Sequence, residues 1–144
     1  VKPGTYVELK RGWAAGDEVE LELDLPVRLV AAHPRVEEVR NQVAVARGPI
    51  VYCLESADLP AEVEIEEVHI SRNAELEARY EADLLGGVTV LEGEVQRIKG
   101  REWQGRLYQT IGEEAARRLP VRLIPYFAWN NRGAVEMTVW LPRC

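Results

Sequence analysis

The chain has 144 residues, a hydrophobic fraction of 47% and a charged fraction of 29%, the size and balance of one globular domain. Its net charge of −6 argues against binding to nucleic acid or to an anionic membrane surface, because both need a basic patch. No apolar run approaches the roughly 20 residues of a membrane helix, and no signal peptide opens the chain. We therefore expect a cytoplasmic protein. Because the chain opens within a strand-like pattern, we also expect a piece of a longer polypeptide.

Alternation of apolar and polar residues with a period of two dominates the first third of the chain. From residue 18 to residue 25 every second residue is Val or Leu and the others are Glu or Asp, which predicts a strand with one buried face. Residues 5–11 alternate similarly, and the glycine-bounded segment 12–16 predicts a turn that joins the two strands. Three further strands are expected at residues 26–33, 41–48 and 49–55, each bounded by Pro, Gly or Asn.

The middle of the chain is less regular. Residues 63–71 alternate as a strand, while residues 74–85 contain good helix formers and also alternate, so a helix and a strand both remain open. Residues 112–119 favour a helix, a loop or a single turn. Later strands are expected at 88–98, 120–129 and 135–142. The pattern predicts one all-β domain over residues 1–144, an antiparallel, jelly-roll-like β-sandwich with at most one or two short helices.

Groups that could carry catalysis are sparse. His33, His69, Cys53 and Cys144 stand at no metal-binding spacing, and the two serines lie in polar connections with no base nearby. The 24 acidic residues would allow a glycosidase-like carboxylate pair, but most lie on the exposed faces of alternating strands. We therefore expect no catalytic residue and no metal ligand in this chain.

The stretch PYFAWNNRGAVEMTVWLP (residues 125–142) combines aromatic rings, amides and an arginine around a polar turn. Such a set suits a sugar-binding site, with Trp129, Asn131 and Arg132 as the candidate contacts. It also suits the closing hairpin of a sandwich, in which Trp129 and Trp140 flank a tight turn and stabilise two paired strands. An inter-domain contact is the third interpretation, and hairpin packing is the one we favour.

Four stretches together resemble the C-terminal region of the bacterial β-L-arabinofuranosidase family of glycoside hydrolases. They are GTYVELKRGWAAGDEVELEL, AHPRVEEVRNQVAVARGPIVYCLE, DLLGGVTVLEGE and IPYFAWNNRGAVEMTVWLP, and they cover nearly the whole chain. The family commonly has Ala at the position of Asn130, and GPGEM where this chain has GAVEM.

The resemblance implies a supporting role for this chain. In this family the active site lies in an upstream (α/α)-barrel, with a cysteine nucleophile and a zinc ion held by glutamate and cysteine side chains. Cys53 matches the cysteine of the VYCLE strand, which is not that nucleophile. The expected role is a C-terminal domain that packs on and stabilises its own barrel, and that aids dimerisation through the edge of residues 6–25. The alternative is a carbohydrate-binding module for plant arabinose-containing glycans.

Overall fold

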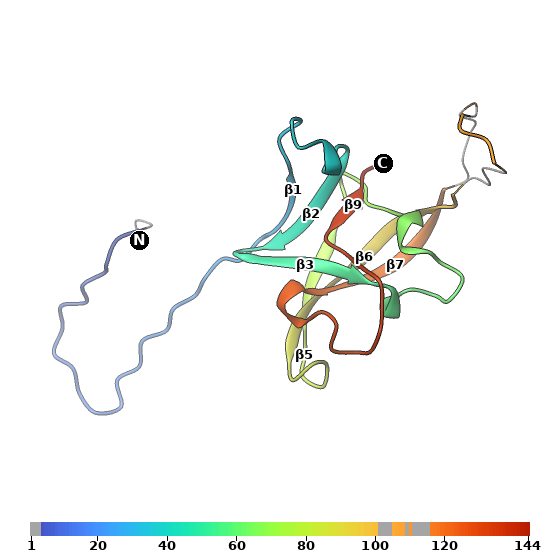
Figure 1. Cartoon of the computed structure of the whole chain (residues 1–144). Helices are drawn as coiled ribbons and strands as arrows, with labels where there is room; N and C mark the ends of the chain where they lie inside the picture. The colour runs from blue at the N-terminus through green and yellow to red at the C-terminus, as the bar shows by residue number, and fades with distance from the viewer. Residues whose placement is uncertain (1–3, 101–104, 109, 111–115) are drawn as a thin grey trace.

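The computed structural model describes residues 4–100, 105–108, 110 and 116–144 (Figure 1). Within these ranges the chain forms nine strands and four single turns of 3-10 helix, with no α-helix. Neighbouring strands pair antiparallel throughout. The predicted all-β, antiparallel sandwich is thereby confirmed. The strands are β1 (Val27–Ala31), β2 (Gln42–Arg47), β3 (Ile50–Glu55), β4 (Val68–His69), β5 (Leu76–Glu81), β6 (Val88–Ile98), β7 (Ala116–Pro125), β8 (Met137–Thr138) and β9 (Trp140–Pro142).

The strands follow the order β1-β2-β3-β7-β6-β4, with β5 paired to β6, β8 to β3 and β9 to β2. The longest ladder joins β6 and β7, from Leu91 opposite Leu123 to Ile98 opposite Ala116. Figure 1 shows β1, β2 and β9 on one side of the body and β5, β6 and β7 on the other, linked through β3. None of the helical turns in the described ranges is long or apolar enough to cross a membrane.

Strands β3 and β7 carry apolar side chains on both faces. Leu54 and Leu123 belong to the main core, whereas the adjacent residues Cys53 and Ile124 belong to a second, smaller cluster. Because successive side chains of a strand point to opposite faces, these two strands separate the two clusters. The second cluster is completed by the C-terminal segment, from which Ala128 and other apolar side chains pack against it. That segment is therefore part of the packed structure.

The ambiguous middle of the chain is extended. Residues 76–81 form β5, which pairs with β6 in a register that runs from Leu76 opposite Gly93 to Glu81 opposite Val88. Pairing with a long neighbouring strand outweighs the helix propensity of this segment. Residues 116–119 begin β7, so the helix considered there is wrong for that part, and residues 112–115 lie outside the described residues. The strand expected at 63–71 is reduced to β4, preceded by a 3-10 turn at Ile65–Glu67.

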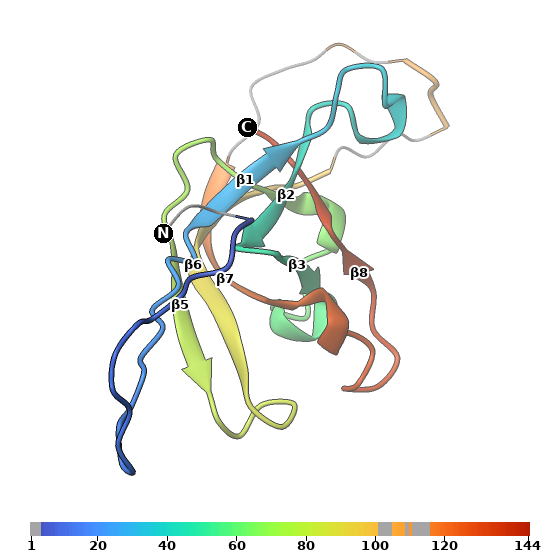
Figure 2. The ribbon, with the colours of Figure 1, turned by 90° about the vertical axis from the view of Figure 1, so that its left-hand side faces the viewer.

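The two strands predicted within residues 5–25 are absent from the structure. We call residues 5–25 the arm: it leaves the body before β1, folds back on itself and carries no strand assignment (Figures 1 and 2). Its large apolar side chains other than Leu25 are exposed, including Leu21 at 76%. Alternation alone does not make a strand, because each strand needs a neighbour for its backbone hydrogen bonds.

The closing hairpin predicted for the C-terminal stretch is also wrong. After β7 the chain makes a 3-10 turn at Tyr126–Ala128, and the segments 137–138 and 140–142 then pair with β3 and β2. Trp140 lies opposite Ala44 of β2, so it does not face Trp129 across a hairpin. The expected positive backbone angles are confirmed, since φ is 62° at Asn130 and 102° at Gly133. The turn residues were predicted correctly and the strand partners were not.

Candidate functional site

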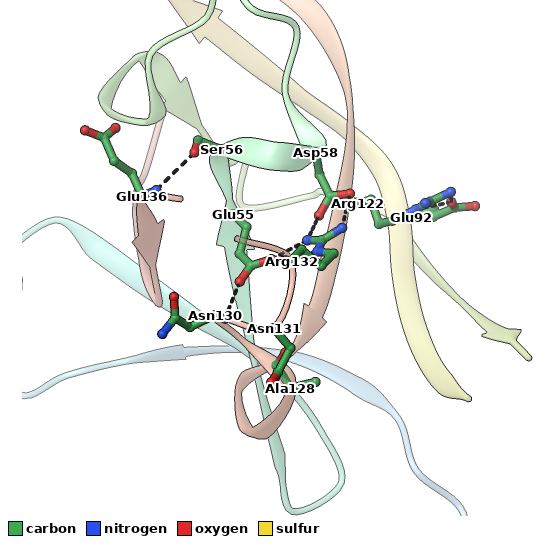
Figure 3. Close-up of polar contacts among 10 residues, drawn as sticks. All are labelled: Glu55, Ser56, Asp58, Glu92, Arg122, Ala128, Asn130, Asn131, Arg132 and Glu136. Carbon is green, nitrogen blue, oxygen red and sulfur yellow. Dashed lines mark hydrogen bonds and ion pairs between the residues drawn. The ribbon is translucent and has the colours of Figure 1, made fainter. Parts of the chain in front are cut away.

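Residues 126–136 form a loop that crosses the end of β3, and we call it the NRG loop after Asn131, Arg132 and Gly133 (Figure 3). Its first turn is closed by a hydrogen bond from the Trp129 N–H to the Tyr126 carbonyl, 3.3 Å long. All three candidate contact residues from the sequence lie in this loop. Their side chains, however, face different surroundings.

Arg132 points inward, to a pair of carboxylates on the body of the domain. Its Nε donates to Glu55 Oε2 at 2.9 Å and its Nη1 donates to Asp58 Oδ1 at 2.9 Å, while Nη2 contacts both carboxylates. Figure 3 shows Glu55 and Asp58 approaching the guanidinium from the end of β3 and the turn that follows. We call these three residues the ion triad.

The ion triad is withdrawn from solvent. The Glu55 side chain is 0% exposed, and those of Asp58 and Arg132 are 7% and 18% exposed. The second oxygen of Glu55 accepts the backbone N–H of Asn130 at 2.8 Å, so both oxygens of this buried carboxylate have partners. A buried charge is tolerated only when it is paired in this way. The triad thus holds the NRG loop to β3 across 77 residues of sequence.

Burial and charge set the titration of the groups around the triad. Hydrogen bonds from Arg132 to Asp58 and then to Glu55 raise the pKa of the guanidinium, so it remains charged. Two residues before Glu55 on β3, burial raises the pKa of the Cys53 thiol to about 12, and the charge of Glu55 adds to this effect. Cys53 is therefore a neutral thiol at physiological pH, and it lacks the thiolate that nucleophilic attack or metal binding requires.

The other two candidates do not converge with Arg132 on a ligand position. The Asn131 amide donates to the carbonyls of Ala128 and Trp129, each at 3.1 Å, and so ties the loop to itself. Trp129 is 36% exposed and stacks on Tyr126, with ring centroids 6.3 Å apart. Phe127, between them in sequence, is 70% exposed. The outer surface of the loop therefore carries exposed aromatic rings, whereas the side chains of Asn131 and Arg132 bond within the domain.

The residues that the structure describes do not fit the zinc ion that the family resemblance associates with the barrel. Within the described ranges no three His, Cys, Asp or Glu side chains gather to hold a metal. Cys53 is a buried thiol on β3, and Cys144, the last residue, is exposed. Nδ1 of His33 accepts the Arg35 N–H, a contact within its own turn. The two serine hydroxyls accept backbone N–H groups of Glu136 and Asn73.

Glu55 and Asp58 were missed by sequence reasoning, although a signal exists. Glu55 ends the apolar strand IVYCLE, where a buried acid requires a cationic partner, and Arg132 is an arginine in a loop that otherwise lacks charge up to Glu136. Nothing in the sequence, however, joins the two across 77 residues.

Comparisons with known proteins agree on one assignment. Residues 27–142 match the model of the glycoside hydrolase family 127 C-terminal domain. A curated relative, the non-reducing end β-L-arabinofuranosidase of Bifidobacterium longum, is 38% identical over 133 residues, which is 90% of this chain and 20% of that protein.

Solved structures give the same result. The family 127 β-L-arabinofuranosidase of Geobacillus stearothermophilus T6 superposes with a TM-score of 0.73 at 42% identity, covering 83% of this chain and 18% of that one. Another family 127 β-arabinofuranosidase superposes with a TM-score of 0.69 at 31% identity, covering 84% and 18%. The chain therefore spans about one fifth of the length of these relatives.

Proposed function

This chain belongs to glycoside hydrolase family 127, as a C-terminal domain of that family, and we propose that it is a non-catalytic accessory domain of a larger β-L-arabinofuranosidase-like enzyme. In this role it packs on the region that carries the chemistry and stabilises that region. The proposal is supported by the domain match and by the size of the relatives, of which the chain spans about one fifth.

The observation that carries the proposal is the internal use of Arg132. Its guanidinium already contacts Glu55 and Asp58, and its side chain is only 18% exposed. To reach a sugar it would have to leave a fully buried carboxylate unpaired, which is strongly unfavourable. The arginine of the NRG loop thus serves the architecture of the domain, as expected for a supporting role.

The surface best suited to contact the rest of the enzyme is the aromatic face of the NRG loop. Tyr126 and Phe127 are 45% and 70% exposed, and Trp129 stacks beside Tyr126. Aromatic side chains are enriched at protein interfaces and carry much of their binding energy. We assign this face as the contact with the catalytic region.

Removal of residues 27–144 from the longer enzyme tests the proposal. We expect a shorter half-life of activity at elevated temperature, and a smaller change in the same direction for Phe127→Ala. Tyr80→Ala is the matched control, because Tyr80 is an equally exposed ring, at 67%, on β5. An unchanged half-life after the deletion would contradict the proposal. So would turnover of a nitrophenyl arabinofuranoside by the purified 144-residue chain.

Carbohydrate binding is the second candidate function, and the exposed stack of Tyr126 and Trp129 favours it. An aromatic face of this kind suits the apolar face of a sugar ring. Calorimetry with arabinan oligosaccharides tests it: binding tighter than millimolar that Trp129→Ala abolishes and Phe127→Ala retains would support a sugar platform. If the unmodified chain gives no heat of binding, carbohydrate binding is contradicted and the accessory role is the remaining candidate function.

A further inference from the structure

One face of the sheet formed by β5, β6 and β7 is polar and open to solvent. Leu91 of β6 belongs to the main core, so the next residue, Glu92, points to the opposite face. On that face Glu92 lies opposite Glu77 of β5 on one side and Arg122 of β7 on the other. The side chains of Glu92 and Arg122 are 34% and 36% exposed. The strands therefore hold these charged groups in fixed positions at the surface.

All guanidinium contacts to Glu92 fall on one of its two oxygens. Oε1 accepts from Arg79 Nη2 at 2.8 Å, and from Arg122 Nε and Nη2 at 3.0 Å and 2.9 Å. Among the residues that the structure describes, none donates a hydrogen bond to Oε2. The hydrogen bonds from Arg79 and then from Arg122 lower the pKa of this carboxyl group, so it stays ionised. Glu92 is thus a fixed, charged acceptor with one oxygen free for a ligand.

Glu92 stands between two hollows of the surface, which we together call the Glu92 groove. The larger has a volume of about 780 Å³ and reaches from Glu92 to Asn73, in the turn before β5. The smaller has a volume of about 630 Å³ and reaches over β7 to Asp58. Both are lined by Glu92 and Gly93, so they meet at this point of β6. Figure 3 shows Glu92 and Arg122 beside Asp58, where the smaller hollow lies. Both volumes fall within the roughly 300–1,000 Å³ of ligand pockets.

The Glu92 groove carries charges of both signs. Its lining has five carboxylates, among them Asp58 and Glu77, and three guanidinium groups, those of Arg79, Arg118 and Arg122. The excess of carboxylates opposes an anionic ligand, and the three guanidinium groups oppose a cationic one. Within the described ranges no three His, Cys, Asp or Glu side chains gather to hold a metal ion. An uncharged ligand with many hydroxyl groups suits this lining best, because a hydroxyl can donate to a carboxylate and accept from a guanidinium.

We propose that the Glu92 groove binds a segment of a neutral oligosaccharide. Oε2 of Glu92 accepts a sugar hydroxyl, and Nε and Nη1 of Arg79, which contact no described residue, donate to neighbouring sugar oxygens. The amides of Asn73 and Gln96 line the same groove and can both donate and accept. The groove shares no lining residue with the NRG loop, so this site is distinct from the aromatic stack of that loop. Only the choice of arabinose as the sugar rests on the proposed function.

Calorimetry of the 144-residue chain with arabinan oligosaccharides and with free arabinose tests the proposal. Because two hollows meet in the groove, a sugar chain that enters both makes more contacts than a single sugar does. We expect the oligosaccharide to bind at least ~10-fold more tightly than arabinose, which is the gain from about one additional hydrogen bond to a charged group. No binding, or equal affinity for the two ligands, would overturn the proposal.

Matched variants of the chain locate the binding. Glu92→Gln should weaken it at least ~10-fold, because it removes the charged acceptor. Glu37→Gln is the control, since Glu37 also pairs with a surface arginine but lies outside the groove. Ala78→Tyr places a ring in the larger hollow and leaves the Glu92 side chain in place, so it should weaken binding at least ~10-fold by exclusion. Unchanged affinity in both groove variants would overturn the proposal, and so would a loss of binding in Trp129→Ala alone.

Two further measurements address other occupants of the groove. Binding of spermidine that Glu92→Gln abolishes, without binding of sugar, would overturn the proposal and assign the groove to a cationic ligand. In a gel that contains arabinan, the longer enzyme should migrate more slowly than its Ala78→Tyr variant. Equal migration would mean that the rest of the enzyme covers the groove, and would overturn the proposal. The accessory role is tested separately, by the half-life of activity after removal of residues 27–144, so either proposal can fail without the other.

Discussion

The arm has the more regular sequence and the NRG loop the less regular one, yet it is the NRG loop that is bound to the body of the domain. Residues 18–25 of the arm alternate strictly, and Val19, Leu21 and Leu23 are exposed. The NRG loop is irregular, yet it is bound to the body of the domain through a buried carboxylate. The comparison teaches that order depends on partners: backbone groups of a strand need a neighbouring strand, whereas three paired charges can hold a loop with no regular structure.

The largest expected effect is at the centre of the loop. Arg132→Met leaves Glu55 buried without its cationic partner, which should lower the free energy of unfolding by about 3–5 kcal/mol. Urea denaturation of the 144-residue chain measures this loss. Arg118→Met is the matched control, because its ion pair with Glu94 is exposed at 84% and 62% and should contribute less than about 1 kcal/mol. A loss for Arg132→Met no larger than for the control would mean that the loop is held by something else.

The second effect is the alkaline stability of the cluster beneath the loop. The Cys53 pKa is about 12 in the folded chain against 9.0 for the ordinary thiol, so the unfolded state releases its proton first as pH rises. The neutral Cys53 thiol makes its full contribution to the free energy of unfolding below pH 9. That contribution is lost as pH rises toward 12, by roughly 2–3 kcal/mol at pH 11. Urea denaturation at pH 8, 9, 10 and 11 measures this slope.

Cys53→Ala should flatten the pH dependence between 9 and 11, whatever its cost at neutral pH. The comparison uses the slope and not the absolute stability, because removal of the sulfur also changes packing. An identical slope in both proteins would show that the thiol is not buried as the structure has it.

The smallest effect is expected at the arm. Removal of residues 1–24 retains Leu25 and its contact with Gly48 and removes no residue of either core cluster. The free energy of unfolding of the shortened chain should therefore stay within about 0.5 kcal/mol of the original. Chemical denaturation is again the measurement, and a loss above about 1.5 kcal/mol would mean that the arm packs on its own domain in solution.

Much of the fold follows from local pattern, and the failures share a cause. Strands β1, β2, β3 and β6 lie where alternation and turn residues place them. The hairpin between Trp129 and Trp140 failed because the segment 137–142 pairs with strands more than 80 residues earlier, a long-range choice that no local signal records. The two strands predicted within the arm are wrong because no described strand pairs with this segment. The triad was missed because Glu55 and Arg132 are distant in sequence and meet only in the folded domain.

The most direct test of the central claim places Arg132→Met in the longer enzyme and compares two quantities. Under the accessory-domain account the half-life of activity at elevated temperature shortens, while kcat/KM measured at low temperature changes less than about twofold. The change in half-life reports the loosened domain, and the constant kcat/KM reports an untouched active site. A tenfold fall in kcat/KM with an unchanged half-life would contradict the account and move Arg132 into the chemistry of the enzyme.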